Sequence, residues 1–170
     1  MGRCERLFEF CAGPAYIGYS LLANGFCERL TLADINPVSV EAARKTAEFN
    51  NIQHLVNTYV SDSLKQIPDS ERWDLVVGNP PHFRAVAAGD ETPPLLLVDP
   101  DWSLHRGFYR SAKQFMKPGG HVLLVENSEG SSERDFEPMI REGGGTFLTS
   151  RAAVTIGGKK TPYYYMMSEW

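Results

Sequence analysis

The chain has 170 residues, of which 42% are hydrophobic and 22% are charged. These values favour one domain with a full-sized core and argue against a disordered chain. No apolar run approaches the length of a membrane span, and the N-terminal residues lack the apolar stretch of a secretory signal. The formal charge of −4 argues against a strong, sequence-independent nucleic-acid binder, although it leaves room for a local basic patch.

The cysteines are odd in number and widely spaced. Cys4, Cys11 and Cys27 form no C-x-x-C pair, so the sequence suggests neither a disulfide framework nor a metal site. Such cysteine usage fits a reducing compartment, and we expect a cytoplasmic protein.

Strand-like and helix-like stretches alternate along the first part of the chain. Gly25 suits the position just past a helix end, and Asn36 and Pro37 suit the N-cap and first position of the next helix. The first five expected elements are a strand over 7–10, a helix over 15–24, a strand over 30–33, a helix from 36 to about 50 and a strand over 55–60.

The alternation continues to a C-terminal hairpin. The later elements are a strand over 73–78, a loop from 83 to about 100, a helix over 102–116, a strand over 121–125, a helix over 132–142, and two strands over 146–156 and 162–168 joined by a Gly-rich turn. Ser132 and Asp135 stand at capping-box spacing at the start of the helix over 132–142. Helical crossovers imply parallel strands with helices on both faces. We therefore predict a single α/β domain over residues 1–170, with a Rossmann-like three-layer αβα architecture and a seven-stranded, mostly parallel sheet ending in an antiparallel hairpin.

The tetrapeptide Asn79-Pro80-Pro81-His82 follows the apolar run 73–78. It lies at the C-terminal end of an expected buried strand, which is where ligands bind in open α/β sheets. Proline has no N–H, so nearby carbonyls have fewer local partners. The Asn79 side-chain oxygen and the Pro80 carbonyl would be two adjacent acceptors, which suit an NH2 group with two protons to donate. The alternative is a plain strand-ending turn.

Acidic residues follow the first two strands as well. Glu9 ends the first strand, and the turn around Gly13 would let the backbone approach a ligand closely. The dinucleotide pattern G-x-G-x-x-G is absent, because Cys11 and Ala15 stand where glycines would be expected. Asp34 follows the second strand at the spacing where an acid binds both hydroxyls of a ribose. The alternatives are an ordinary strand–helix turn and a helix-capping role for Asp34.

The remaining candidates flank these positions. Asp62, next to Ser63 after the third strand, could accept a hydrogen bond from an exocyclic amine such as that of adenine, or could be a surface turn residue. His82 and Phe83 could sandwich a flat guest, with core packing as the alternative for Phe83. The loop over 84–101 could be a lid or a simple surface loop.

The order of Glu9, Gly13, Asp34, Asp62 and the Asn-Pro-Pro-His motif along an alternating β/α chain resembles the class I S-adenosylmethionine-dependent methyltransferases. It looks most like the branch with an Asn-Pro-Pro-aromatic motif, which methylates planar amino or amide nitrogens. The resemblance implies S-adenosylmethionine as cofactor, and a protein glutamine or an RNA or DNA base amine as methyl acceptor. The acidic balance slightly favours protein or a small planar substrate. No membrane partner is expected, and the sequence indicates no oligomeric state.

Carried onto this chain, the resemblance gives each position a role. Glu9 and Gly13 would line the methionine end of the cofactor, Asp34 would hold the ribose, Ile35 would pack on adenine, Asp62 would meet the adenine amine, and Asn79 and Pro80 would hold the target nitrogen. The predicted sites are thus catalytic Asn79, Pro80, Pro81 and His82; cofactor-binding Glu9, Cys11, Gly13, Asp34, Ile35, Asp62, Ser63 and Asn79; substrate-binding His82 and Phe83; and no metal site.

Two departures from the family pattern leave alternatives open. Cys11 and Ala15 replace glycines usual in the first motif, so the cofactor turn would be tighter or shifted. His82 replaces the usual Tyr or Phe, so the stacking face is smaller. A separate substrate-binding domain is also missing, which suggests a fragment or a minimal catalytic core. The alternative functions are a non-catalytic partner subunit with a methyltransferase fold and an NAD-dependent oxidoreductase; the Asn-Pro-Pro motif argues against the latter.

Overall fold

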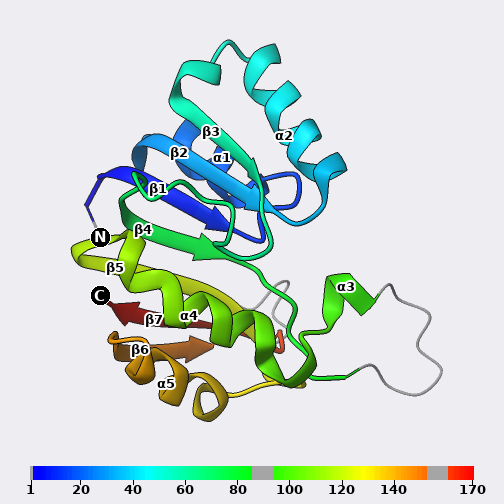
Figure 1. Ribbon diagram of the computed structural model, residues 1–170, viewed down its shortest axis with the longest axis vertical. Helices are drawn as coiled ribbons and strands as arrows, with labels where there is room; N and C mark the ends of the chain where they lie inside the picture. The colour runs from blue at the N-terminus through cyan, green and yellow to red at the C-terminus, as the bar shows by residue number, and fades with distance from the viewer. Residues whose placement is uncertain (1, 86–93, 153–160) are drawn as a thin grey trace.

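A seven-stranded sheet forms the middle layer of the protein (Figure 1). The computed structural model describes residues 2–85, 94–152 and 161–170. The strand order is β3-β2-β1-β4-β5-β7-β6; the first five strands are parallel, and β7 is antiparallel to both of its neighbours. The strands are β1 Cys4–Phe10, β2 Cys27–Asp34, β3 Val56–Val60, β4 Trp73–Gly78, β5 Met116–Asn127, β6 Thr146–Ala152 and β7 Tyr163–Glu169. The predicted fold class is confirmed.

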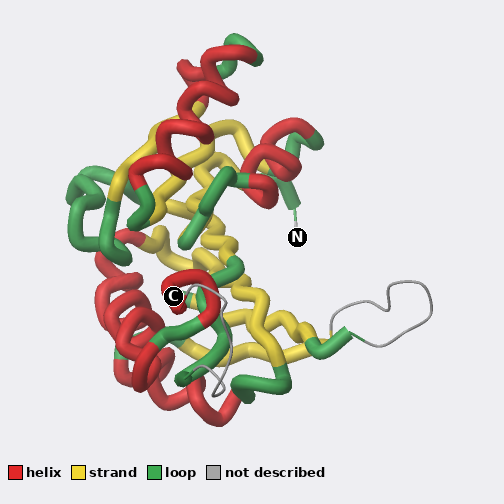
Figure 2. Tube along the Cα trace, turned by 90° about the vertical axis from the view of Figure 1, so that its right-hand side faces the viewer, coloured by secondary structure: helices red, strands yellow, loops and turns green. Residues whose placement is uncertain are grey.

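Helices lie on both sides of this sheet (Figure 2). Side chains of α1 and α2 pack with one buried cluster, and side chains of α4 and α5 with the other. The helices are α1 Tyr16–Ala23, α2 Pro37–Phe49, α3 Pro94–Leu97, α4 Ser103–Phe115 and α5 Glu133–Glu142, with short 3-10 turns η1 Gln53–Leu55 and η2 Pro100–Trp102. The three-layer αβα architecture therefore follows directly from these two cores.

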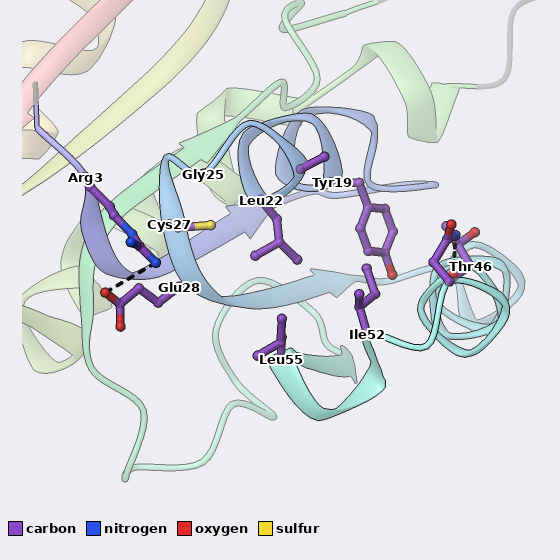
Figure 3. Close-up of a pocket in the computed structure, with 11 residues that line it drawn as sticks. Arg3, Tyr19, Leu22, Gly25, Cys27, Glu28, Thr46, Ile52 and Leu55 are labelled. Atoms are coloured by element: carbon purple, nitrogen blue, oxygen red, sulfur yellow. Dashed lines mark hydrogen bonds and ion pairs between the residues drawn. The ribbon is translucent and has the colours of Figure 1, made fainter.

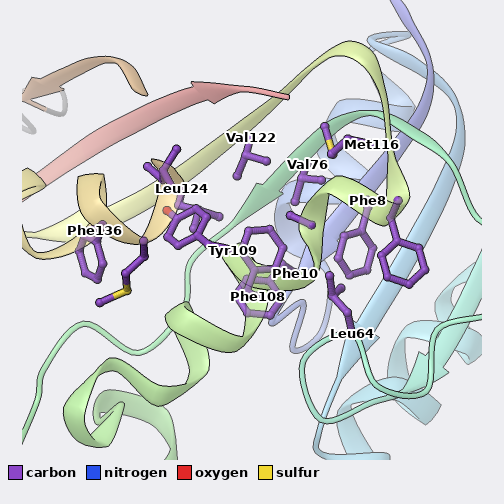
Figure 4. Close-up of a cluster of buried hydrophobic side chains, with 14 of the residues drawn as sticks. Phe8, Phe10, Leu64, Val76, Phe108, Tyr109, Met116, Val122, Leu124 and Phe136 are labelled. Atoms are coloured by element: carbon purple, nitrogen blue, oxygen red, sulfur yellow. The ribbon is translucent and has the colours of Figure 1, made fainter. Parts of the chain in front are cut away.

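Alternation along the central strands divides the core between the two faces. Leu7 belongs to the cluster under α1 and α2, whereas its neighbour Phe8 belongs to the cluster under α4 and α5. The second cluster is rich in aromatic rings (Figure 4). Trp73 stacks between Phe8 and Phe115, with ring centroids 4.0 and 5.2 Å apart. These stacks join β1, β4 and α4 and set the position of the adjacent sheet edge.

Several local predictions are confirmed by hydrogen bonds. Asn36 caps α2, since its side-chain oxygen accepts from Val38 N at 2.9 Å, and Pro37 occupies the first helical position. The capping box of α5 is present, with Asp135 Oδ2 accepting from Ser132 N at 2.9 Å. The three cysteines are unpaired, as the absence of a disulfide framework required.

The structure also corrects some boundaries. β5 begins at Met116 and includes residues 117–120, the Lys-Pro-Gly-Gly segment that was expected to separate the helix from the strand. The β4–β5 register shifts between Trp73 and Leu75, and this irregularity accommodates the segment. The predicted loop after residue 83 contains the helix α3 and the 3-10 turn η2. Residues 153–160, which cover the end of the predicted strand over 146–156 and the Gly-rich turn, lie outside the described residues, as do residues 86–93 of the loop. Within the described ranges, no helix is long and apolar enough to cross a bilayer.

Replacing Gly78 by alanine tests the close contact of β4 with β1. A Cβ atom there would lie 2.7 Å from the Phe10 carbonyl oxygen, whereas a Cβ at Gly107, inside α4, would meet nothing within 4 Å. We expect Gly78→Ala to lower the free energy of unfolding by about 1–3 kcal/mol. The control Gly107→Ala should raise it by roughly 0.5–1 kcal/mol, because alanine favours helix. Denaturant unfolding measures both, and a Gly78→Ala protein as stable as wild type would contradict this contact.

Candidate active site

The predicted site residues gather at the C-terminal ends of the parallel strands. In the parallel register Phe10 pairs with Ala33 on one side and with Gly78 on the other. The residues that follow these three paired positions, Cys11, Asp34 and Asn79, therefore lie together at the C-terminal ends of the strands. Open α/β sheets bind ligands at this carboxyl edge.

The turn between β1 and α1 is held by two carboxylates. Glu9 Oε2 accepts from Gly18 N and Asp34 Oδ2 accepts from Gly13 N, both at 2.7 Å. Ala15, the residue before α1, has no side-chain group to cap the helix, so the Glu9 carboxyl satisfies a first-turn N–H from the neighbouring strand. A Cβ at Gly18 would lie 2.6 Å from Glu9 Oε2, which explains why the position is glycine.

The backbone of this turn is left-handed at three alternate positions. Cys11, Gly13 and Ala15 have φ angles of 53°, 51° and 65°. The two side-chain-bearing residues adopt a conformation that glycine adopts readily, at a cost of roughly 1–2 kcal/mol each. Cys11 and Ala15, which stand where the family usually has glycines, therefore adopt a backbone conformation that is typical of glycine.

Glu9 is the buried acid of the turn, with only 3% of its surface exposed. Burial raises the pKa of Glu9 to about 7, with a smaller contribution from Asp34, although the N–H groups of Gly18 and Ile17 oppose it. The carboxyl therefore changes its charge near neutral pH. A cation bound beside it would favour the ionised form.

Asp34 has both a capping role and free acceptor capacity. Its Oδ1 accepts from Asn36 N at 2.8 Å, so the capping alternative holds for one oxygen, and Oδ2 accepts from Gly13. Each carboxylate oxygen keeps a further lone pair for a ligand hydroxyl. Ile35 next to it is 48% exposed and offers an apolar surface for a flat ring.

The segment after β3 combines a surface turn with one unpartnered group. Asp62 pairs with Lys65 at 2.5 Å, as a surface turn residue would. Ser63 has a left-handed φ of 54°, and its buried hydroxyl has no hydrogen-bond partner among the residues described. Buried polar groups are nearly always satisfied, so a bound polar ligand would fit here.

The acceptor turn, residues 79–82, ends β4. Asn79 is exposed, Pro80 is buried and Pro81 is half-buried. In the part of the chain that is described, neither the Asn79 side-chain amide nor the Pro80 carbonyl takes part in a hydrogen bond. Both oxygens thus keep their lone pairs without a partner among the described residues.

His82 and Phe83 point to different surroundings. His82 is 7% exposed; its Nδ1 lies 3.4 Å from Glu126 Oε2, and its ring meets that of Tyr163 edge-on. Phe83 is half-buried, and its ring packs so closely on Gly130 that a Cβ there would lie 2.4 Å away. This arrangement favours the packing alternative for Phe83, and the sandwich of a guest between the two rings stays a prediction.

A buried charged cluster next to the acceptor turn escaped the sequence analysis. His105 places Nδ1 2.7 Å from Asp99 Oδ2 and Nε2 3.0 Å from Glu126 Oε1, and all three residues are buried. Burial lowers the pKa of His105, but Glu126 and Asp99 outweigh it and raise the pKa to about 9. Burial raises the pKa of Asp99, but hydrogen bonds from His105 and from backbone N–H groups bring it below its usual value. An acid just after a strand, the signal used for Asp34, would also have selected Glu126.

A separate hollow lies near the opposite edge of the sheet, between α1, α2 and the start of β2 (Figure 3). It encloses roughly 710 Å³ and contains none of the predicted site residues. Cys27 and Glu28 on its wall begin β2, so it lies at the amino ends of the strands, away from the edge where such sheets bind ligands. We assign no role to it.

The residues at the carboxyl edge fit S-adenosylmethionine. The buried Glu9 carboxyl suits a cationic group, Asp34 keeps lone pairs for ribose hydroxyls, exposed Ile35 suits adenine, and the Ser63 hydroxyl lacks a partner. Among the described side chains, no group of three His, Cys, Asp or Glu residues could hold a metal ion.

Comparison with known proteins gives a family match. Residues 3–143 match the family described as "Methyltransferase small domain". Ribosomal RNA small subunit methyltransferase C of Hahella chejuensis is 30% identical over 123 residues, which are 72% of this chain and 31% of that protein. Release factor glutamine methyltransferase of Clostridium acetobutylicum is 28% identical over 143 residues, covering 76% of this chain and 49% of that protein. The chain thus spans about a third to a half of the length of these relatives.

Solved structures share the fold. A T. thermophilus 16S rRNA methyltransferase in complex with AdoMet and guanosine aligns with a TM-score of 0.67 and 21% identity, covering 99% of this chain and 38% of that one. The [4+2]-cyclase SpnF aligns with a TM-score of 0.71 and 12% identity, covering 99% and 76%. Since a cyclase shares the architecture, the function must be argued from the site.

Replacing Ala15 by glycine tests the strained turn. Ala15 is fully buried with a φ of 65°, and Ala43, in the interior of α2, is equally buried. Both glycine variants lose a buried methyl group. At position 15 glycine also relieves about 1–2 kcal/mol of backbone strain. At position 43 it destabilises the interior of the helix by about 1 kcal/mol, because glycine has a low helix propensity. We expect Ala15→Gly to be more stable than Ala43→Gly by roughly 2 kcal/mol in denaturant unfolding; equal losses would show that the turn is unstrained.

The pKa of Glu9 predicts a pH-dependent affinity for S-adenosylmethionine. Below pH 7 the folded protein carries Glu9 largely protonated, because its pKa is raised to about 7. The cationic ligand favours the carboxylate, so binding releases a proton and the affinity rises with pH, by up to about tenfold per unit below the pKa. Calorimetry at pH 6 and pH 8 in buffers of different ionisation enthalpy measures both the affinity and the proton release.

The Glu9→Gln variant is the control for this measurement. Protons that the ligand itself gains or loses contribute equally in the wild type and in the variant. The difference in affinity and proton release between the two proteins therefore comes from Glu9. We expect the variant to bind more weakly at pH 8 and to release fewer protons at pH 6. Identical pH slopes in the two proteins would remove Glu9 from the cofactor site.

Proposed function

We propose that the chain, which belongs to the methyltransferase small domain family, is an S-adenosylmethionine-dependent methyltransferase that transfers the methyl group to a planar amino or amide nitrogen. The observation that carries this proposal is the pair of unpartnered oxygens in the acceptor turn, Asn79 Oδ1 and the Pro80 carbonyl. Two acceptors side by side match the two N–H donors of an NH2 group.

The chemistry explains why such a nitrogen needs this site. S-adenosylmethionine supplies a methyl group on a positively charged sulfur. The lone pair of an amide or aromatic amine is delocalised, so the nitrogen is a poor nucleophile. Acceptors placed by Asn79 and Pro80 hold both N–H groups and stabilise the positive charge that develops on the nitrogen. This is preorganised electrostatics with the sign opposite to that of an oxyanion hole. Holding the nitrogen in attack geometry lowers the barrier further.

Two acceptors are the first to test. The relatives named above are a ribosomal RNA methyltransferase and a release factor glutamine methyltransferase, and both a guanine amine and a glutamine amide present a planar NH2 group. Incubation with S-adenosylmethionine carrying a labelled methyl group, once with small-subunit ribosomal RNA and once with a release factor, followed by mass spectrometry of the digested products, identifies the methylated atom. Methylation confined to carbon or oxygen would overturn the proposal.

Truncating Asn79 tests the acceptor pair directly. We expect Asn79→Ala to lower kcat by about 100-fold, by analogy with removing one oxyanion donor, while the affinity for S-adenosylmethionine changes little. The matched control is Asn50→Ala, which removes an exposed amide at the C-terminal end of α2. Single-turnover kinetics and calorimetry separate the two effects, and near-normal turnover in Asn79→Ala would remove this mechanism.

A further inference from the structure

Four side chains form a continuous buried chain that ends in the acceptor turn. Asp99 precedes α4 and accepts from the backbone N–H groups of Leu104 and His105 at 2.7 and 3.0 Å. Its Oδ2 also contacts His105 Nδ1 at 2.7 Å, and His105 Nε2 contacts Glu126 Oε1 at 3.0 Å. The other oxygen of Glu126 lies 3.4 Å from His82 Nδ1. The chain thus links α4 and β5 to the residue that follows the Asn-Pro-Pro motif.

His105 is the rigid centre of this chain. Both ring nitrogens face carboxylate oxygens, which only accept, so both nitrogens carry a proton and the ring is an imidazolium. The ring of Phe136 stacks on it at 4.5 Å, and Trp102 meets it edge-on at 5.5 Å. Glu126 therefore has one oxygen held by a buried cation and only its second oxygen left for His82.

We propose that Glu126, held by His105 and Asp99, is a positioning residue that sets the ring orientation and the tautomer of His82 in the acceptor turn. This inference rests on the proposed N-methyl transfer at Asn79 and Pro80. A carboxylate facing Nδ1 requires the proton on Nδ1 and leaves the lone pair on Nε2. The 3.4 Å contact is longer than those of His105, and it is the contact through which the cluster reaches the acceptor turn.

The composition of the cluster favours a role beyond stability. In this cluster two buried carboxylates share one imidazolium. A protein with a buried ionic cluster is often no more stable than a variant with hydrophobic residues of the same volume at those positions. Burial and then the charges of Asp34, Asp99 and Glu126 raise the pKa of the Cys11 thiol, so the cluster and the turn after β1 influence one another electrostatically.

The first test reads the His82 ring without any methyl acceptor. In Glu126→Gln the side chain keeps its shape, but its NH2 group donates where the carboxylate accepted. We expect nitrogen NMR of the imidazole to show His82 protonated at Nδ1 in wild type and at Nε2 in the variant, by analogy with the tautomer switch of a catalytic triad whose acid is amidated. An unchanged His82 tautomer overturns the proposal.

The second test is a double-mutant cycle with His82→Phe, using whichever of the two acceptors above the wild type methylates. We expect Glu126→Gln alone to lower kcat by about 10–100-fold, with KM for S-adenosylmethionine unchanged, as for other residues that orient a functional group. In the His82→Phe background the same substitution should change kcat less than about twofold, because its target is gone. If the two substitutions lower kcat by independent factors that multiply in the double variant, Glu126 has a structural role and the inference is overturned.

Glu71→Gln is the matched control. Glu71 is also a buried carboxylate, and it accepts from Thr31 and Trp73 near the opposite end of β4. It should change the thermal midpoint without moving kcat or the His82 tautomer; a loss of kcat equal to that of Glu126→Gln would overturn the inference. Methylation confined to carbon or oxygen would refute the proposed function, and the NMR measurement would still decide the role of Glu126.

Discussion

Two hydrogen bonds from backbone N–H groups to carboxylates hold the turn between β1 and α1, where the cofactor is predicted to bind. Gly18 N donates to Glu9 and Gly13 N donates to Asp34, so the acids that end β1 and β2 also shape the turn between β1 and α1. Hydrogen bonds to charged groups contribute about 1.5–3 kcal/mol each. That is enough to offset the roughly 1–2 kcal/mol for each left-handed residue with a side chain, which explains how Cys11 and Ala15 persist where glycine would be easier. Cys11 and Ala15 thus keep the backbone conformation that glycine would adopt at these positions.

The buried acids of this protein are neutralised in three different ways. Glu71 receives hydrogen bonds from Thr31 and Trp73, and the Arg6 guanidinium lies 3.8 Å from its Oε2. Asp99 and Glu126 share the His105 imidazolium. Glu9 has only backbone N–H donors and Asp34 nearby, so its pKa rises to about 7. A buried carboxyl without a positively charged partner favours a cationic ligand, because the ligand supplies the charge that the protein lacks. Glu9 thus differs from Glu71, Asp99 and Glu126, which have cationic partners within the fold.

Sequence reasoning recovered what depends on local signals. The bounds of β4, the Asn36 cap of α2 and the capping box of α5 follow from residues a few positions apart, and the structure has each of them. It missed the Asp99–His105–Glu126 cluster, because that cluster joins residues 6 and 21 positions apart through packing of α4 on β5. From the sequence, the replacement of glycines by Cys11 and Ala15 predicted a tighter or shifted turn. The sequence does not reveal that hydrogen bonds hold these two residues in a left-handed backbone. The assignment of individual residues to cofactor and acceptor stays a prediction.

The strand order explains why the two halves of the site meet. The chain moves from β1 outward to β2 and β3, then returns to place β4 on the other side of β1, and the crevice at such a reversal is where ligands bind. Cys11 follows β1 and Asn79 follows β4, directly after the paired residues Phe10 and Gly78. A shift of one residue in this register would move the acceptor turn by about 3.3 Å along the strand. Reacting atoms must lie roughly 3–3.5 Å apart for attack, so under the proposed methyl transfer such a shift would abolish activity. The close Phe10–Gly78 contact, where a Cβ would lie 2.7 Å from the Phe10 carbonyl oxygen, fixes this register in the fold.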